Sequence, residues 1–519
     1  MIKKVICLIM TFGIPGIALA NSTSADIEAL QSQLKQLQKE VNTLKSELTA
    51  KSSGASAGGT AQAAPPVDAS SPDYGKTPVR LTNDEVSEMR QQLAGQQLKI
   101  DTLTDAANTG PIAGLSVTGY IDPTYLYNRG AGTSSFLFAN HDSAYNYFNS
   151  TFGDVYLDIK KTFGVGPMAP SAEVTLMPNR GSGSLFMDEH GDGGLDILNT
   201  AIITVPVTAT TSFVAGLMPS FGGYEVQQSN QMLTLTHNLL YDFSDPGSYI
   251  GAGVNYLSAD GHWAWKFLLG NEQYRTSGSV AQTGTNALGD PITSSNRMPT
   301  FTARVDYMRG SALDIGGSFN IGRQTLVSGS DSNGNPVYGV GGAAHNAYGT
   351  FFFAEADATY TLADVQYNAE VDYGQQQNAA YNGGQAQWYG LSLLGHRKFN
   401  MPVLGRMGVT ARYDLLVNAK NGGGGGGIAQ NANGMDTANG FGIGASCLAN
   451  SKANGGLGFE CKGAAHQDVA LDLLFYPTQQ ITVKVEYRHD WATQDVFSHN
   501  DGSYGKSNDI VATQFIYTF

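Results

Sequence analysis

Residues 509–519 alternate between two kinds of side chain, and this pattern limits the possible fold more than any other stretch of the chain. One face of an extended strand here would carry Val511, Thr513, Phe515, Tyr517 and Phe519, and the other Ala512, Gln514, Ile516 and Thr518. Ile516 is the one large apolar residue on the second face. A tilted strand of this length crosses a bilayer with one face toward lipid and one toward a polar interior. The pattern therefore predicts a strand of a membrane β-barrel.

The first twenty residues have the pattern of a cleavable secretory leader. Lys3 and Lys4 precede the largely apolar stretch 5–19, and Ala18-Leu19-Ala20 supplies a small-x-small cleavage site. We expect residues 1–20 to be removed and the mature protein to begin at Asn21. An alternating strand that closes on Phe519 also resembles the assembly signal of bacterial outer-membrane barrels. Both features predict the outer membrane as the destination.

Charge excludes one class of partner. Removing Lys3 and Lys4 with the leader changes the formal net charge from −14 to −16. A chain this acidic is a poor match for nucleic acid, and we expect none as a partner.

Apolar residues recur at alternating intervals of three and four near the start of the mature chain. They are Ile27, Leu30, Leu34, Leu37, Val41, Leu44 and Leu48. Such a narrow heptad seam predicts an α-helical coiled coil over 21–50, located in the periplasm, and therefore a homo-oligomer.

A linker and a second helix follow this coiled coil. Residues 51–80 are rich in Ala, Gly, Ser and Pro, which predicts a flexible linker. A capping box of Thr82 and Glu85 opens a second helical segment over 81–106. This segment either continues the coiled coil or lies against the mouth of the barrel.

From residue 115 onward the period changes to two, which predicts an all-β domain over 115–519. We expect a transmembrane antiparallel β-barrel of about sixteen strands, with fourteen or eighteen as the alternatives. The expected strands are 115–127, 152–162, 171–178, 197–207, 210–218, 248–257, 262–274, 299–308, 311–321, 347–360, 363–374, 386–396, 405–416, 466–476, 480–490 and 509–519. Charges confined to one face of a strand suit a polar interior behind a lipid-facing wall. A sandwich of soluble sheets is the alternative.

Short connections alternate with long ones between these strands. Segments such as 207–210 and 477–480 are short, whereas 219–247 and 417–465 are long. Short periplasmic turns alternating with long outer loops are typical of outer-membrane barrels, and an even strand number places both termini in the periplasm.

The mature chain retains two cysteines, Cys447 and Cys461, within one Gly/Asn-rich segment. In an oxidising compartment we expect a disulfide between them that closes this loop. A metal site would need more ligands than His466, the one nearby candidate.

The segment between the fifth and sixth predicted strands, 219–246, occupies the position of the inward-folded constriction loop of many porins. We expect acids of this loop to face bases of the wall. The acids are Glu225, Asp242 and Asp245, and the bases are Lys266, Arg304, Arg412, Lys484 and Arg488. A transverse field of this kind orders polar solutes and selects them by charge. In the alternative, wall charges pair with each other, such as Lys484 or Arg488 with Asp472.

Three stretches, 27–48, 216–256 and 510–519, carry a resemblance to a known family. Together with the order of leader, heptads, Ala/Pro-rich linker and barrel, they are similar to the LbtU-type siderophore porins, the legiobactin-uptake outer-membrane proteins. The resemblance implies facilitated, plug-free uptake of a ferric siderophore. By analogy with porins, we expect a trimer in outer-membrane lipid.

Two other functions remain open, a general diffusion or anion/sugar porin, and a structural barrel that tethers the outer membrane through its coiled coil. We expect no enzyme, since His237, His262, His396 and His489 have no accompanying nucleophile motif. We also expect no cofactor and no bound metal.

Overall fold

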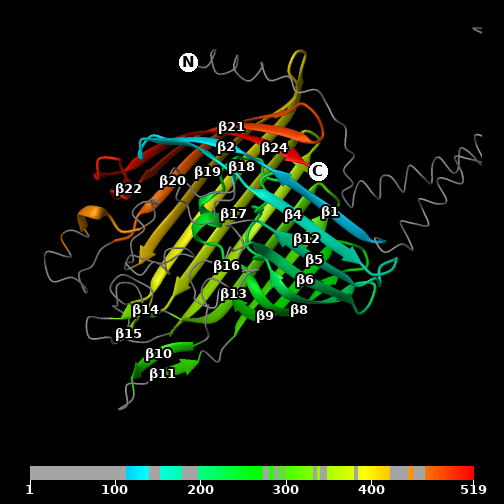
Figure 1. Ribbon diagram of the computed structural model, residues 1–519, viewed down its shortest axis with the longest axis horizontal. Helices are drawn as coiled ribbons and strands as arrows, with labels where there is room; N and C mark the ends of the chain where they lie inside the picture. Colours follow the sequence, from blue (N-terminus) through cyan, green and yellow to red (C-terminus); the bar gives the residue numbers. More distant parts are fainter. Residues whose placement is uncertain are drawn as a thin grey trace, which may run out of the picture. The chain divides into compact units, whose positions relative to one another are not determined.

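The computed structural model describes residues 113–138, 152–177, 197–272, 280–285, 291–295, 299–325, 327–330, 336–338, 348–378, 384–420, 442–447, 450 and 462–519. Val117–Phe519 forms one compact unit around a single large sheet (Figure 1). The predicted leader, coiled coil, linker and second helical segment all lie outside the described residues and stay predictions. In the part of the chain that is described, no helix is long and apolar enough to cross a membrane.

The large sheet is a closed antiparallel barrel. Its segments are β1 (Leu115–Ile121), β2 (Thr124–Asn128), β3 (Thr133–Leu137), β4 (Val155–Thr162), β5 (Ser171–Leu176), β6 (Leu198–Pro206), β7 (Thr211–Met218), β8 (Tyr249–Leu257), β9 (Trp263–Glu272), β12 (Thr300–Arg309), β13 (Leu313–Thr325), β16 (Tyr348–Leu362), β17 (Val365–Gln376), β18 (Ala386–Met401), β19 (Gly405–Lys420), β20 (Ala465–Tyr476), β21 (Ile481–Ala492) and β24 (Ser507–Thr518). β1 and β2 both pair with β24 and are halves of the first strand. β3 pairs with β2 and β4 with β1, so these are halves of the second strand. The predicted number of sixteen strands is therefore confirmed.

Alternation of side chains separates a polar interior from an apolar exterior. In β21, Lys484 and Arg488 are buried inside the barrel, whereas Tyr487 beside them is 45% exposed. In β17, Asp372 is buried and Val371 is 50% exposed. A wall with this arrangement suits lipid on the outside and polar groups on the inside.

The first and last strands close the barrel. The backbones of Gly119 and Phe519 exchange two hydrogen bonds of 2.9 Å. The first strand breaks at Asp122-Pro123, because proline has no N–H to donate to the ladder. The Asp122 carboxylate stabilises the break by accepting hydrogen bonds from the Asp154 backbone N–H and the Gln514 amide.

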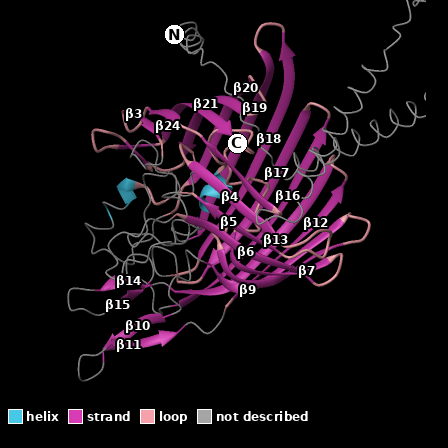
Figure 2. Cartoon of the chain, turned by 45° about the vertical axis from the view of Figure 1, so that its right-hand side comes forward, coloured by secondary structure: helices cyan, strands magenta, loops and turns pink. Residues whose placement is uncertain are grey.

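Short turns gather at one end of the barrel, as predicted. They join β6 to β7, β8 to β9, β12 to β13, β16 to β17, β18 to β19 and β20 to β21. Longer connections leave the other end and carry small hairpins, including β10 (Val280–Thr285) with β11 (Pro291–Ser295) and β14 (Val327–Ser330) with β15 (Pro336–Tyr338), as Figure 2 shows. A third pair, β22 (Phe497–Ser498) with β23 (Tyr504–Gly505), precedes β24. Of the predicted disulfide, Cys447 is described and Cys461 is not, so that bond stays a prediction.

Candidate functional site

The connection between β7 and β8, residues 219–248, lies inside the barrel, and we call it the inner loop. It leaves the wall at Met218 and returns at Tyr249. Between these points it hydrogen-bonds to side chains of β12, β17, β18, β19, β20 and β21. In the sheet these strands lie away from β7 and β8, so the loop crosses the interior. Its predicted inward fold is confirmed.

Three buried bases of the wall bind the backbone of the inner loop. Arg412 donates to the His237 carbonyl at 2.8 Å, and Arg488 donates to the same carbonyl at 3.0 Å. Lys484 donates to the Thr234 carbonyl at 2.7 Å. A charged donor makes a stronger hydrogen bond than a neutral one, particularly away from water. These side chains therefore hold the middle of the loop against the wall.

Two carboxylates of the wall accept hydrogen bonds from the same part of the loop. The Leu235 N–H donates to Asp472 at 2.9 Å and to Glu486 at 2.8 Å. The Thr236 hydroxyl donates to Glu486 at 2.7 Å. The wall thus satisfies both donors and acceptors of a loop backbone that has no sheet partner of its own.

A second set of contacts holds the beginning of the loop. Arg304 donates to the Phe221 carbonyl at 3.0 Å, and the Lys266 ammonium lies 5.8 Å from the centre of the Phe221 ring. The hydroxyls of Tyr224 and Ser392 lie 2.7 Å apart. Both the beginning and the middle of the inner loop are therefore attached to the wall.

The helix α4 (Leu239–Phe243) contributes side chains to an apolar cluster inside the barrel. Its N-cap residue, Asn238, accepts a 2.6 Å hydrogen bond from the Tyr241 N–H. Leu240 and Phe243 are buried among wall side chains that include Trp388. The full cluster is Leu126, Leu137, Phe152, Leu235, Leu239, Leu240, Phe243, Phe351, Phe353, Ala386, Trp388, Leu416, Ile510 and Ala512. Burial of this much apolar surface makes the loop part of the core rather than a loose flap.

Each arginine of the site also pairs with an aspartate two residues later on its own strand. The pairs are Arg304 with Asp306 at 2.6 Å, Arg412 with Asp414 at 2.8 Å and Arg488 with Asp490 at 2.9 Å. Residues two apart on a strand share a face, so this Arg-x-Asp spacing could have been recognised in the sequence. Arg488 also pairs with Asp468 of the neighbouring strand at 3.0 Å, so wall charges do pair with each other as the alternative interpretation held, with Asp468 in place of Asp472.

The transverse field stays a prediction, although the structure does bring loop acids and wall bases together. Three of the five bases, Arg304, Arg412 and Arg488, pair with wall carboxylates, and these three and Lys484 also donate to loop carbonyls. Glu225 and Asp242 do lie within electrostatic reach of Arg412. Asp245 lies within electrostatic reach of Arg304 and also lies against the carboxylates of Glu370 and Asp372.

Burial changes the protonation of the loop acids. It raises the pKa of Glu225 to about 7, although the positive charges of Arg412 and Lys484 oppose the shift. It also raises the pKa of Asp242 to about 7 against the charges of Arg488 and Arg412. Glu225 and Asp242 are therefore partly protonated at neutral pH, so the charge of the inner loop changes with pH in this range.

Some polar side chains of the interior keep contact with solvent. Asp158, Lys160, Glu173, Lys266 and Asp314 are half-buried and lie toward the short-turn end of β4, β5, β9 and β13. Lys160 and Glu173 form a 3.0 Å ion pair whose side chains are 45% and 30% exposed. Water therefore reaches this part of the interior, in contrast to the side that the inner loop covers.

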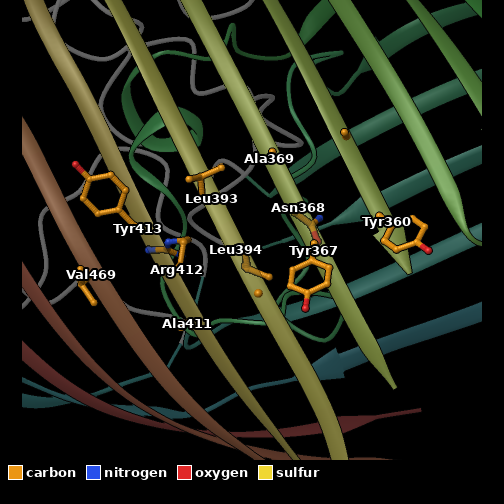
Figure 3. Close-up of a pocket in the computed structure, with 12 residues that line it drawn as sticks. Tyr360, Tyr367, Asn368, Ala369, Leu393, Leu394, Ala411, Arg412, Tyr413 and Val469 are labelled. Carbon is orange, nitrogen blue, oxygen red and sulfur yellow. The ribbon is translucent and has the colours of Figure 1, made fainter. Parts of the chain in front are cut away.

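A groove on the barrel wall is a less suitable solute site. It is lined by exposed apolar or aromatic side chains such as Tyr360, Tyr367 and Leu393, with small residues such as Ala369 and Ala411 at its floor (Figure 3). These side chains belong to the outward face of β16 to β20. A groove there suits an apolar surrounding and not a polar ligand.

A family model described as "Protein of unknown function (DUF3138)" matches residues 1–519. No curated protein has a detectably similar sequence. Among solved structures, the outer-membrane expressed OmpT of Vibrio cholerae aligns with a TM-score of 0.45 and 11% identity, over 78% of this chain and 97% of that one. The outer membrane channel DcaP of Acinetobacter baumannii aligns with a TM-score of 0.44 and 12% identity, over 78% and 97%. An anion-selective porin from Comamonas acidovorans gives 0.43 and 12%, over 78% and 99%.

Proposed function

The chain belongs to the DUF3138 family, and we propose that it is an outer-membrane channel for small polar solutes, narrowed by its inner loop. One observation carries the proposal. A loop crosses a closed, polar-lined barrel and is bound to the wall by the buried side chains of Arg412, Lys484 and Arg488. Sixteen strands enclose enough space for an aqueous channel, and a loop fixed inside that space restricts it.

The exterior of the barrel supports a membrane location. Large apolar side chains on successive outward positions, such as Leu471 and Leu473 on β20, are 50% and 45% exposed. An apolar belt of this extent is unfavourable in water and favourable in lipid. The half-buried polar residues on β4, β5, β9 and β13 support a remaining path for water beside the inner loop.

Single-channel recording of the purified mature protein in planar bilayers tests the proposal. We expect discrete current steps that are small for a sixteen-stranded barrel, because the inner loop occupies part of the cross-section. Folded protein that inserts but carries no current would overturn the channel and leave a structural barrel as the better function.

The resemblance to LbtU-type siderophore porins supports a finer proposal, that the solute is a ferric siderophore. Because Arg412 and Arg488 are already engaged by the loop and by wall carboxylates, attraction of a polycarboxylate would depend on bases that keep contact with solvent, such as Lys266. Titrating a ferric carboxylate siderophore into the same bilayer tests this point. Block of the current by the ferric form, and not by the iron-free form, is expected. An indifferent current would favour a general diffusion porin.

A further inference from the structure

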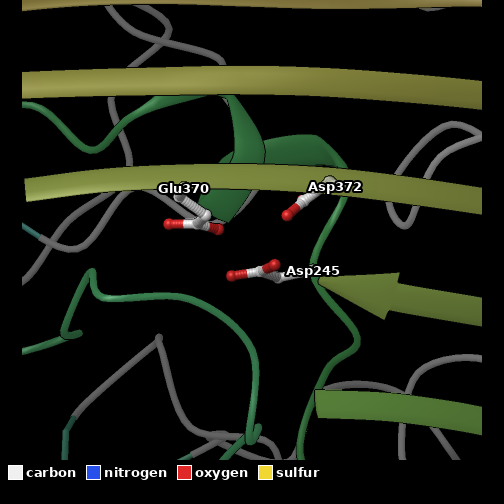
Figure 4. A group of neighbouring side chains, drawn as sticks. All are labelled: Asp245, Glu370 and Asp372. Carbon is white, nitrogen blue, oxygen red and sulfur yellow. The ribbon is translucent and has the colours of Figure 1, made fainter. Parts of the chain in front are cut away.

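Three carboxylates from two separate segments meet where the inner loop ends. Asp245 follows α4, and Glu370 and Asp372 are inward residues of β17. Each offers an oxygen, and these oxygens all lie within 4.8 Å of one another. In Figure 4 the three side chains point toward a common centre. We call them the acidic triad.

The acidic triad is buried and its charge is poorly compensated. Asp245, Glu370 and Asp372 are only 5%, 1% and 5% exposed. Neither carboxylate oxygen of Asp245 has a hydrogen-bond partner outside the acidic triad among the described residues. Removing a carboxylate from water without a partner is strongly unfavourable. The geometry therefore calls for a positive charge at this point.

Arg304 acts electrostatically on Asp245, but this arginine is already paired with other acids. Arg304 forms ion pairs with Glu355 at 3.1 Å and with Asp357 at 2.7 Å, and it also pairs with Asp306. Glu355 and Asp357 come from β16, next to β17, and add negative charge beside the acidic triad. Arg304 is thus shared among three other carboxylates, and no base of the described residues forms an ion pair with the acidic triad.

The backbone of the inner loop closes the site from one side. A Cβ atom added at Gly222 would lie 2.8 Å from an Asp245 oxygen, and one at Gly223 would lie 2.6 Å from a Glu370 oxygen. The Tyr224 N–H donates to Glu370 at 3.3 Å. Two glycines let the chain approach the carboxylates closely, so the triad lies in an enclosed site between loop and wall.

We propose that the acidic triad binds one hard divalent cation, with Ca²⁺ as the preferred ion, and that this ion fixes the end of the inner loop to β17. A set of ligands composed only of oxygen atoms suits Ca²⁺, which accepts carboxylates, carbonyls and water in a flexible arrangement. Zn²⁺ favours nitrogen and sulfur ligands, which the triad does not supply. The bound ion would supply the positive charge that Arg304 does not. This inference rests on the position of the loop and is independent of which solute passes.

Terbium luminescence on the full mature protein in detergent tests the site. Tb³⁺ replaces Ca²⁺ at oxygen sites and is excited by a nearby tryptophan. The indole of Trp388 donates to Ser244, the neighbour of Asp245, at 3.1 Å, so it lies beside the triad. We expect a Tb³⁺ signal that Ca²⁺ displaces, that Mg²⁺ displaces less well, and that D245N/D372N loses. Asp364→Asn, in the exposed turn between β16 and β17, is the matched control and should keep the signal.

Wild-type protein decides the question even if the double variant does not fold. Removal of Ca²⁺ with a chelator should lower the thermal midpoint of the wild type, and added Ca²⁺ should restore it. Absence of a Ca²⁺-displaceable signal together with an unchanged midpoint would overturn the proposal. A signal that survives in a folded D245N/D372N variant would place the ion elsewhere and overturn it equally. Channel currents are a separate measurement, so failure of the cation site would leave the channel standing.

Discussion

The guanidinium group of Arg412 donates a 2.8 Å hydrogen bond to the carbonyl oxygen of His237, a residue 175 positions earlier in the chain. One group belongs to β19 and the other to the inner loop, whose ends are on the opposite part of the sheet. Both residues are buried, at 1% and 0% exposure. Because neither group can turn to water, breaking this contact would leave a buried charge and a buried carbonyl unsatisfied.

Replacing Arg412 should therefore destabilise the protein and release the inner loop. Arg412→Met removes the donor and leaves Asp414 and Asp468 without one of their cationic partners. Breaking a buried pair in this way lowers the free energy of unfolding by about 3–5 kcal/mol. We expect a larger single-channel conductance as the loop loses its hold. Arg397→Met, on an exposed arginine, is the control. Equal conductance and stability in both variants would contradict a holding role for Arg412.

Packing of α4 makes a second, independent prediction. Leu240 is fully buried in the apolar cluster with Phe243 and Trp388. Leu240→Ala should lower the free energy of unfolding by about 2–5 kcal/mol, because a cavity remains where the side chain was. Leu404→Ala, at a position 38% exposed in a short turn, should change it by less than about 0.5 kcal/mol. Denaturant unfolding in detergent, followed by tryptophan fluorescence, measures both. A small effect at Leu240 would mean that α4 contributes little to the core.

The strands could be predicted from the sequence because each strand has one face toward lipid and the other toward a polar interior. Lipid outside and polar groups inside impose a strict period of two, as Lys484, Tyr487 and Arg488 on β21 illustrate. Short turns join consecutive strands as neighbours, so the order of strands in the sheet follows the order in the chain. An antiparallel sheet in this order closes when the last strand pairs with the first. The inner loop was also predictable, because the long connection between the fifth and sixth strands occupies the position of the inward-folded constriction loop of many porins.

Partners within the site could not be predicted, because they depend on how far each strand is staggered against the next. Glu370 faces Ser392 across β17 and β18, and Asp372 faces Gly390, and only this register brings the two acids to Asp245. Nothing in the local sequence around Asp245 indicates that stagger. The Arg-x-Asp pairs differ, since both members lie on one strand and a period of two places them on one face. Sequence therefore predicts contacts within a strand better than contacts across the interior.

Stability should depend on pH through the inner loop. Burial raises the pKa of Glu225 from 4.5 to about 7 and that of Asp242 from 3.8 to about 7. Between the usual and the raised values, the folded protein holds protons that the unfolded chain has released, so its stability falls as pH rises through this range. We expect a lower unfolding midpoint at about pH 8 than at about pH 5. The difference should shrink in Glu225→Gln/Asp242→Asn and persist in Asp364→Asn. An unchanged pH slope in the double variant would assign the effect to other acids.

Closure of the barrel gives the last prediction, a comparison of two glycines in the wall. A Cβ atom at Gly119 would collide with the Tyr156 carbonyl oxygen of β4 and lie 2.9 Å from the Phe519 ring. A Cβ atom at Gly395 would meet nothing closer than the Tyr367 ring at 3.7 Å. Because a backbone oxygen cannot move aside easily, Gly119→Ala should destabilise the barrel by about 1–3 kcal/mol. Gly395→Ala should be neutral or slightly stabilising, since it reduces the freedom of the unfolded chain. Thermal unfolding in detergent separates the two, and a neutral Gly119→Ala would mean that β1 can move away from β4 without loss of the fold.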